Sequence, residues 1–271
     1  MLLNKISDPL DIIILAGQSN AEGYGLGPCD NTYIPTPKIL SMRDTDNYGY
    51  VVDEKSRGTF NITMPRDYLI GITEERQNTS GKIGCFATSF ARKYMENDLE
   101  EGRRVLIIHT AVGATGFAKH HWGVGDVLYE RMLDMTSEAL AMNPDNRLVA
   151  VIWHQGEHDA IFRPDLCDEE RKNTHILELG AVIKGFREKF GEIPFIMGGF
   201  NDELRATVPR MDVIMSAMRT LTTVLPRVAL VNAEGLPTNN QTLSNGDQYH
   251  FSRDSLNKLG ERYYSVYSLL K

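Results

Sequence analysis

Five short runs of apolar residues, rich in β-branched side chains, recur along the chain. They are DIIILAG (11–17), RVLIIHTA (104–111), RLVAVIW (147–153), IPFIMGGF (193–200) and RVALVNA (227–233). Unbroken apolar runs of this length are typical of strands that are buried on both faces of a parallel sheet. The pattern therefore predicts five central strands.

Segments with helical spacing separate several of these runs. Aromatic residues repeat every four positions over 86–97, and apolar stripes with helical spacing run through 174–190 and 254–270. Strands that alternate with helices indicate βαβ units, whose helices cover both faces of the sheet. Because no repeat or linker divides the chain, we predict an α/β fold, a three-layer α/β/α sandwich, formed by one domain over 1–271.

The segment 25–83 interrupts this alternation. It is rich in Gly, Pro, Asn and Asp and shows no clear apolar stripe. A long segment without regular structure inside a compact domain is usually functional, or else its elements have been misread. We interpret it as a long loop insertion, either a plain surface loop or a lid beside the functional site.

Composition and charge narrow the classes of function. The chain has 271 residues, of which 42% are hydrophobic and 24% charged, so it has the composition of a globular protein. A net charge of -7 does not favour a protein that binds nucleic acid or an anionic membrane surface. No apolar run approaches the roughly 18 residues of a membrane span. The composition leaves the oligomeric state open.

The cysteines and the first residues bear on the cellular compartment. The three cysteines are scattered and form no C-x-x-C pair: Cys29, Cys85 and Cys167. Scattered cysteines fit reduced thiols in a cytoplasmic protein. The first eleven residues contain no apolar core of signal-peptide length. We therefore predict a cytoplasmic protein, with secretion after removal of a signal sequence as the alternative.

Two polar blocks supply the residue types of a catalytic triad. The block GQSN (17–20) ends the first apolar run, and ligands of open parallel sheets bind at the carboxyl ends of strands. Ser19 is therefore a candidate nucleophile, and the alternative is an N-cap of the next helix. The block DQYH (247–250) precedes the final helix, where Asp247 can orient His250 within one turn; the alternative is an ordinary polar turn.

The third apolar run ends in WHQGEHD (153–159). Its histidines, His154 and His158, match the zinc-binding pattern H-x-x-E-H, which requires both on one helical face. Because the block directly follows a strand and contains Gly156, we favour a strand-end loop without metal. Gln155 of that loop can offer its amide to a developing oxyanion.

Two further loops follow predicted strands. AVGATG (111–116) consists of small residues, which let the backbone approach a ligand or satisfy a loop that needs glycine conformations. GFND (199–202) follows the fourth predicted strand, and we interpret it as a strand-end turn. In that block, Asn201 is an alternative donor to an oxyanion.

Together these blocks resemble the SGNH-hydrolase superfamily, and more narrowly its sialate O-acetylesterase branch, which includes the acetylxylan esterases of carbohydrate esterase family 6. The matching blocks are GQSN (17–20), Gly113, HQGE (154–157) and Asp247 with His250. They span almost the whole chain in the family's order. The resemblance implies a five-stranded parallel, flavodoxin-like sheet. It also implies a serine esterase that removes O-acetyl groups from a carbohydrate, its partner, without a cofactor.

The resemblance also implies roles for single residues. Ser19 corresponds to the nucleophile, His250 to the general base and Asp247 to the acid that orients it. The backbone N–H groups of Ser19 and Gly113, with the Gln155 side chain, correspond to the oxyanion hole. The triad would form an acyl-enzyme in the course of the reaction.

Three residues are candidates for substrate binding. Trp122 corresponds to a tryptophan beside the sugar, unless it is a packing aromatic, and Gln18 neighbours the nucleophile. Glu157 is either a substrate contact that also supports its loop or a second acid for the histidine. The chain departs from the family pattern at Ala114, which weakens the assignment of the second oxyanion donor, and at His158, which would reshape the pocket.

Other functions remain open at this stage. An esterase or thioesterase on lipid or small acyl substrates would use the same triad. A catalytically silent carbohydrate-binding module would keep the pocket alone, although the complete set of Ser, His and Asp argues against it. A zinc hydrolase would use the two histidines of the H-x-x-E-H pattern.

Overall fold

The strand β1 (Leu10–Gly17) lies in the middle of the sheet, and every residue in it is buried. Alternate residues from Ile12 face one hydrophobic core, and alternate residues from Ile13 face a second core on the other side. The parallel neighbours of β1 are β6 (Arg104–His109) and β7 (Arg147–His154). A strand with a core on each face has no solvent-facing position, which explains its unbroken apolar run.

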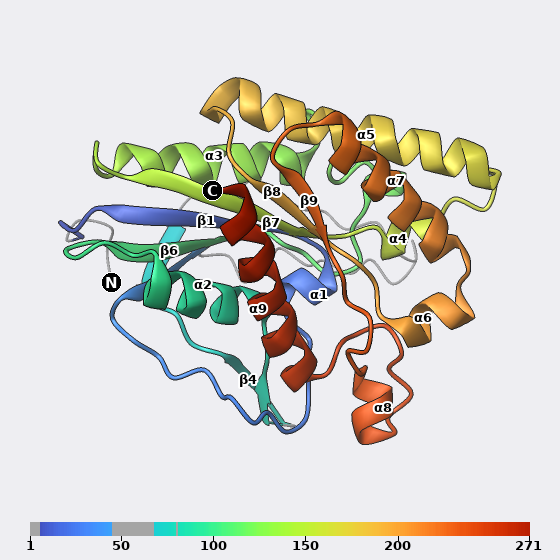
Figure 1. The fold of residues 1–271 in the computed structure, drawn as a ribbon, viewed down its shortest axis with the longest axis horizontal. Coiled ribbons are helices and arrows are strands. Elements are labelled where there is room, and N and C mark those ends of the chain that lie inside the picture. The colour runs from blue at the N-terminus through green and yellow to red at the C-terminus, as the bar shows by residue number, and fades with distance from the viewer. Residues whose placement is uncertain (1–5, 45–67, 80) are drawn as a thin grey trace.

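The computed structural model describes residues 6–44, 68–79 and 81–271. Over these residues the central sheet has seven strands in the order β3-β2-β6-β1-β7-β8-β9 (Figure 1). The strands β8 (Phe195–Gly198) and β9 (Val228–Val231) extend it in parallel on one side. The five predicted strands are all present, and their spatial order 2-1-3-4-5 is that of flavodoxin-like sheets.

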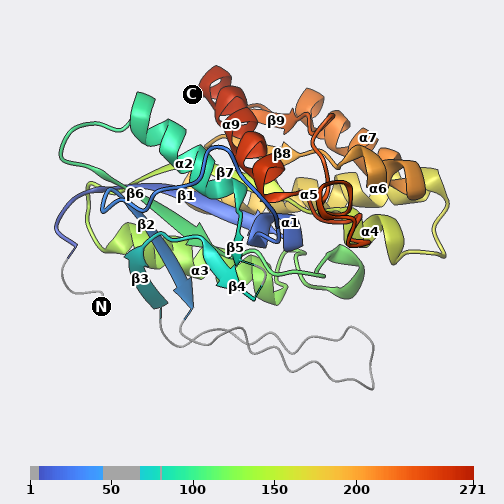
Figure 2. The ribbon, with the colours of Figure 1, turned by 90° about the horizontal axis from the view of Figure 1, so that it is seen from below.

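The segment 25–83 is not the loop that its composition indicated, which corrects the expected strand count. It adds β2 (Ile39–Asp44), parallel to β6, and β3 (Tyr68–Ile72), antiparallel to β2 (Figure 2). It also forms a small ribbon from β4 (Arg76–Asn78) and β5 (Gly81–Ile83). The edge strand β3 is a short apolar stretch, YLIGI, in which Leu69 and Ile72 are about half exposed, at 50% and 48%. The part 45–67 lies outside the described residues.

Long helices cover both faces of the sheet (Figure 1). The helices α3 (Val127–Ala141), α5 (Asp168–Phe190) and α7 (Arg210–Val224) pack on one core, and α2 (Phe86–Asn97) and α9 (Arg253–Leu270) pack on the other. The helices predicted from the three apolar stripes are α2, α5 and α9, so the three-layer α/β/α architecture is confirmed. Within the described ranges, no helix is both long and apolar enough to cross a membrane.

Short helices follow the strand ends and position the polar blocks. They are α1 (Ser19–Glu22), the 3-10 helix η1 (Phe117–Lys119), α4 (Glu157–Ile161), α6 (Asp202–Thr207) and α8 (Asn239–Leu243). Helix α1 follows β1, and α4 follows the neighbouring strand β7. Since the chain order of the strands reverses beside β1, these two helices begin at the switch point where such sheets bind ligands.

Candidate active site

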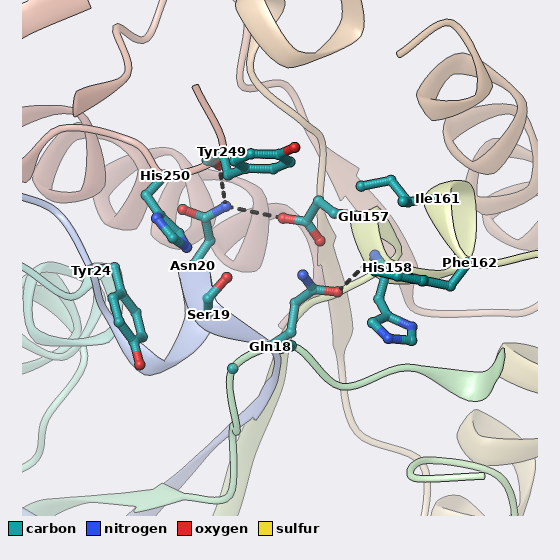
Figure 3. Close-up of a pocket in the computed structure, with 12 residues that line it drawn as sticks. Gln18, Ser19, Asn20, Tyr24, Glu157, His158, Ile161, Phe162, Tyr249 and His250 are labelled. Atoms are coloured by element: carbon teal, nitrogen blue, oxygen red, sulfur yellow. Dashed lines mark hydrogen bonds between the residues drawn. The ribbon is translucent and has the colours of Figure 1, made fainter. Parts of the chain in front are cut away.

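A pocket of about 370 Å³ lies at the carboxyl ends of β1 and β7 (Figure 3). Its lining comes from four distant parts of the chain: Gln18, Ser19, Asn20, Tyr24, Gly113, Ala114, Glu157, His158, Ile161, Phe162, Tyr249 and His250. The structure therefore brings together most of the residues singled out in the sequence: Gln18, Ser19, Gly113, Glu157 and His250. Gln155 and Trp122 do not line the pocket.

A tight turn presents Ser19 at the end of β1. Gly17 has a φ of 127°, and a Cβ atom on it would lie 2.1 Å from the carbonyl oxygen of His154. Only glycine permits this approach, which lets the Gln18 N–H donate to the His154 carbonyl at 2.9 Å. Gln18 occupies the N-cap position and Ser19 is the first residue of α1, so Ser19 is not the cap of that helix.

His250 is bound to Asp247, as the local sequence predicts. Its Nδ1 lies 2.9 Å from Oδ2 of Asp247, and the Asn239 amide donates to the same oxygen at 2.9 Å. Burial raises the pKa of Asp247, but the hydrogen bonds from His250 and Asn239 outweigh it and lower this pKa to about 2. An ionised carboxylate only accepts hydrogen bonds, so Nδ1 carries the hydrogen and Nε2 is free to accept one. Figure 3 shows that second nitrogen pointing toward Ser19.

An aromatic ring supports the imidazole of His250. The ring of Tyr24 stacks on it with centroids 4.9 Å apart and planes 20° from parallel. The guanidinium of Arg76 lies 5.3 Å from the centre of the Tyr24 ring. Burial, and then the nearby Glu22 carboxylate, raise the pKa of Tyr24, whose hydroxyl group hydrogen-bonds to Glu22. The stack holds the plane of the imidazole beside the pocket.

The backbone N–H of Gly113, which was expected to face an oxyanion, is bound to the carboxylate of Glu22. It donates to Oε2 of Glu22 at 2.7 Å, while Oε1 of Glu22 accepts a hydrogen bond from Arg76 at 2.9 Å. The Glu22 side chain is only 5% exposed. Gly113 therefore lines the pocket as predicted, but its N–H is engaged with a carboxylate that none of the four motif blocks contains. The role of Gly113 as an oxyanion donor therefore stays a prediction.

Of the two glutamines in the motifs, Gln18 lines the pocket, whereas Gln155, which was expected beside the oxyanion, lies in the protein interior. The amide nitrogen of Gln155 donates to Oδ2 of Asp159 at 2.6 Å and to the Thr115 carbonyl at 3.5 Å, within the protein interior. Both amide hydrogens are thus used away from the pocket, which corrects the role expected for Gln155. Gln18 lines the pocket instead. Its Oε1 accepts the His158 N–H at 3.2 Å, and its amide nitrogen faces the pocket in Figure 3.

Asn20 links the nucleophile turn to both neighbouring loops. Its amide nitrogen donates to Oε1 of Glu157 at 3.0 Å and to the Tyr249 carbonyl at 3.1 Å (Figure 3). Its Oδ1 accepts the Phe251 N–H at 3.1 Å. Glu157 is therefore hydrogen-bonded to the GQSN turn, whereas Asp247 is the acid bound to the Nδ1 of His250. Burial raises the pKa of Glu157.

Trp122 belongs to the core beneath the glycine loop. Its side chain is fully buried, and its indole N–H donates to Oγ1 of Thr115 at 2.9 Å. It packs edge-on against Trp153 with ring centroids 4.9 Å apart. The expectation that it borders the sugar is therefore corrected, because the side chain is enclosed between the loop and β7.

Asn201 supports the turn that carries His250 and does not reach the pocket. Its amide donates to the carbonyls of Gln248 and Tyr249, both at 3.3 Å. Its Oδ1 caps α6 by accepting the Leu204 N–H at 2.7 Å. All its hydrogen-bonding groups are thus used for structure, in agreement with the interpretation of GFND as a strand-end turn.

The H-x-x-E-H pattern does not lie on one helix. His154 ends β7, where its Nδ1 lies 3.2 Å from the Tyr263 hydroxyl, and His158 belongs to α4 after Gly156, whose φ is 138°. Burial lowers the pKa of His154 to about 3 and that of His158 to about 4, so both are neutral. In the part of the chain that is described, no three His, Cys, Asp or Glu side chains form a group that could hold a metal ion.

Three aromatic residues that the sequence analysis did not single out stand around the pocket. Tyr24 is 38% exposed, Tyr249 51% and Phe162 53%, which is unusual for large rings in a fold with so complete a core. Each lies within five positions of a predicted site residue. That proximity to the motifs, together with aromatic character, is the sequence signal that could have identified them.

Comparison with known proteins was made for the whole chain. The family model described as "Carbohydrate esterase, sialic acid-specific acetylesterase" matches residues 9–268. A probable 9-O-acetyl-N-acetylneuraminic acid deacetylase of Escherichia coli strain K12 is 26% identical over 196 residues, which cover 62% of this chain and 58% of that protein, less than two thirds of its length. A probable carbohydrate esterase of Arabidopsis thaliana is 26% identical over 252 residues, 87% of this chain and 84% of that one.

Solved structures share the fold. The crystal structure of NanS superposes with a TM-score of 0.73 at 17% identity and covers 98% of both chains. An Arabidopsis thaliana protein superposes with a TM-score of 0.71 at 20% identity, over 96% of this chain and 98% of that one. Since the family model spans nearly the whole sequence, the chain belongs to the carbohydrate esterase family of sialic acid-specific acetylesterases.

Proposed function

We propose that this protein is a serine esterase that removes O-acetyl groups from a carbohydrate. The observation that carries the proposal is that Ser19 and His250 line one pocket, while His250 is hydrogen-bonded to Asp247. Nucleophile, base and orienting acid are the three parts of a triad, and a triad is recognised by geometry and roles. Membership of the acetylesterase family supports the acetyl group and the carbohydrate as the two halves of the substrate.

The reaction proceeds through an acyl-enzyme. His250 takes the Ser19 proton on Nε2 while the serine oxygen attacks the acetyl carbonyl, and Asp247 stabilises the imidazolium that forms. The tetrahedral intermediate collapses, and the sugar alcohol leaves with the proton from His250. A water molecule, activated by the same base, then hydrolyses the acetyl-serine ester and releases acetate.

The oxyanion is stabilised by donors beside the nucleophile. The Ser19 N–H lies in the first turn of α1, where backbone N–H groups have no acceptor within the helix. The Gln18 side chain lines the same wall, with its oxygen held by the His158 N–H and its nitrogen facing the pocket. We assign the Ser19 N–H and the Gln18 amide as the donors to the developing charge.

The test compares the protein with Ser19→Ala on p-nitrophenyl acetate and on a panel of acetylated sugars. Loss of the nucleophile should lower kcat by about 10⁴–10⁶-fold. The matched control is Ser265→Ala, on the exposed side of α9, which should keep the full rate. Circular dichroism checks that both variants are folded, and an assay with EDTA is expected to give the same rate as one without it.

Each other outcome points to another function. Normal turnover in folded Ser19→Ala protein would end the serine-esterase proposal. Hydrolysis of p-nitrophenyl acetate, without hydrolysis of any acetylated sugar, would favour an esterase on small acyl substrates. Binding of sugars without turnover of any ester would favour a carbohydrate-binding module, and a rate lost in EDTA would favour a metal hydrolase.

A further inference from the structure

Glu157 lines the pocket with hydrogen-bonding capacity that the described protein does not use. Its side chain is 5% exposed, its Oε1 accepts a hydrogen bond from Asn20 at 3.0 Å, and its own backbone N–H also hydrogen-bonds to the carboxylate. Its Oε2 has no hydrogen-bond partner among the described residues. Figure 3 shows Oε1 turned to Asn20 and the second oxygen turned away from it. Because buried polar atoms nearly always have a partner, an unpartnered carboxylate oxygen at a pocket wall points to a ligand that supplies a hydroxyl group.

Neither His154 nor the catalytic pair of His250 and Asp247 engages the Glu157 carboxylate in a hydrogen bond. The Nε2 of His154 lies 3.6 Å from Oε1, beyond hydrogen-bond distance, and burial lowers the pKa of His154 to about 3, so the ring brings no charge. Asp247, not Glu157, is hydrogen-bonded to the Nδ1 of His250. Glu157 therefore does not have the orienting role in the triad, and the proposed mechanism gives it no step.

The rest of the rim suits a sugar ring. Tyr249 exposes 51% of its surface beside the pocket and is the ring best placed to meet a sugar. Tyr24 and Phe162, which are 38% and 53% exposed, already stack on His250 and His158 and shape the rim around it. Aromatic faces bind apolar surfaces such as the C–H face of a pyranose, and a few polar groups then fix the orientation of the ligand. In the described lining, Glu157 is the acidic side chain in the position to do so.

We propose that Glu157 binds a free hydroxyl group of the sugar on the ring carbon next to the acetyl ester. The inference rests on the proposed esterase function and specifies its substrate as a partly acetylated sugar with a free neighbouring hydroxyl. The position follows from Asn20, the residue after Ser19, which hydrogen-bonds directly to Glu157. The nucleophile and the carboxyl group thus line one pocket on linked residues, and we therefore place the bound hydroxyl group on the ring carbon next to the ester.

Such a contact gives strong selectivity. A site built to hydrogen-bond a substrate hydroxyl rejects the analogue that lacks it, because the buried group of the protein is then left without a partner. A purely structural role, in which Glu157 only holds Asn20, would weaken the reaction with every ester to the same degree. The two roles are separated by a ratio of rates between two substrates.

The experiment uses three probes with the full-length protein: p-nitrophenyl acetate, a methyl xyloside with one acetyl group and a free neighbouring hydroxyl, and the same xyloside with that hydroxyl replaced by hydrogen. We expect the protein to favour the hydroxyl probe over the deoxy probe by about 10²-fold or more in kcat/KM. Glu157→Gln should reduce this ratio by at least about 10-fold. The matched control is Glu178→Gln, a half-buried carboxylate on α5 that is paired with Arg163 at 2.7 Å; it should keep the ratio.

Two outcomes would contradict the inference without contradicting the proposed esterase function. In the first, the unmodified protein hydrolyses the two xylosides equally well. In the second, Glu157→Gln keeps the ratio between the xylosides while the rates on all three probes fall together. If Glu157→Gln does not fold, the comparison of the xylosides on the unmodified protein decides alone. Absence of hydrolysis of p-nitrophenyl acetate would instead remove the proposed function, and the inference with it. Calorimetric binding of both xylosides to Ser19→Ala gives the same preference without turnover.

Discussion

The carboxylate of Glu22 accepts the backbone N–H of Gly113 at 2.7 Å, and this bond joins the helix that carries the nucleophile to the loop after β6. The other oxygen of the same carboxylate accepts a hydrogen bond from Arg76, at the start of β4. One buried side chain thus connects three segments that are distant in sequence. Because Glu22 lies in α1 with Ser19, it fixes the position of the nucleophile relative to the facing wall of the pocket.

Replacement of Glu22 by Ala should destabilise the fold. The change removes the hydrogen bond from the Gly113 N–H at 2.7 Å and the ion pair with Arg76 at 2.9 Å. Loss of these buried interactions should lower the free energy of unfolding by about 1–3 kcal/mol. Urea denaturation followed by circular dichroism measures it.

The control for this change is Glu96→Gln. Glu96 is 45% exposed, and its ion pairs with described residues are long, at 4.0 and 3.7 Å, so the unfolding free energy should change by less than about 0.5 kcal/mol. A loss for Glu22→Ala no larger than for this control would show that the Glu22 network does not stabilise the protein.

The two glutamines should differ in their effect on turnover. Gln18→Ala removes the proposed side-chain donor to the oxyanion and should lower kcat on p-nitrophenyl acetate by about 10²–10³-fold. Gln155→Ala removes hydrogen bonds to Asp159 and Thr115 in the interior, so it should act mainly on stability. Steady-state kinetics, with melting curves for both variants, make the comparison. The reverse ranking in folded proteins would return the oxyanion role to Gln155.

Replacement of Asp247 and replacement of Glu157 should lower kcat on p-nitrophenyl acetate by different amounts. Asp247→Asn keeps the shape of the side chain but disfavours the His250 tautomer with hydrogen on Nδ1, so kcat should fall by up to about 10⁴-fold. Glu157→Gln leaves that tautomer untouched and should cost clearly less in kcat on p-nitrophenyl acetate. Both variants are measured under saturating substrate after their folding is checked. A larger loss for Glu157→Gln would move the acid role to Glu157.

The low pKa of Asp247 also makes a prediction for stability at acid pH. This pKa is about 2 in the folded protein against an ordinary 3.8, so the ionised carboxylate stabilises the fold above about pH 4. As the pH falls from about 4 to 2, the unfolded chain takes up the proton first and this contribution is lost. Asp247→Asn cannot titrate. The stability advantage of the unmodified protein over Asp247→Asn, from urea curves at a series of pH values, should therefore shrink across this interval, and a constant difference would contradict the prediction.

Most of the architecture could be predicted from the apolar runs, because a strand with a core on each face needs an apolar residue at nearly every position. The edge strands β2 and β3 could not be predicted in this way. In β3, Leu69 and Ile72 are each about half exposed, at 50% and 48%, so this strand has no uniform pattern of burial.

In the site too, contacts between residues close in sequence could be predicted, whereas contacts between distant residues could not. Asp247 and His250 lie in one turn, so their three-residue spacing was enough to predict the pair. Gln155 was assigned wrongly because its partner, Asp159, lies one helical turn further along α4, and the helix could not be seen from a block containing glycine. The N–H of Gly113 donates to Glu22, which is 91 positions away, and no local sequence pattern predicts such a contact.

The hydrogen bond from the Phe251 N–H to Asn20 has a consequence for folding, since these residues are 231 positions apart. Contacts with so large a sequence separation form slowly, because closing the intervening chain costs entropy before the contact is gained. During synthesis, Ser19 leaves the ribosome long before His250 exists. Esterase activity should therefore be among the last properties to appear as the chain folds, and the rate at which it returns in a refolding experiment would time the docking of the His250 turn against the Ser19 turn.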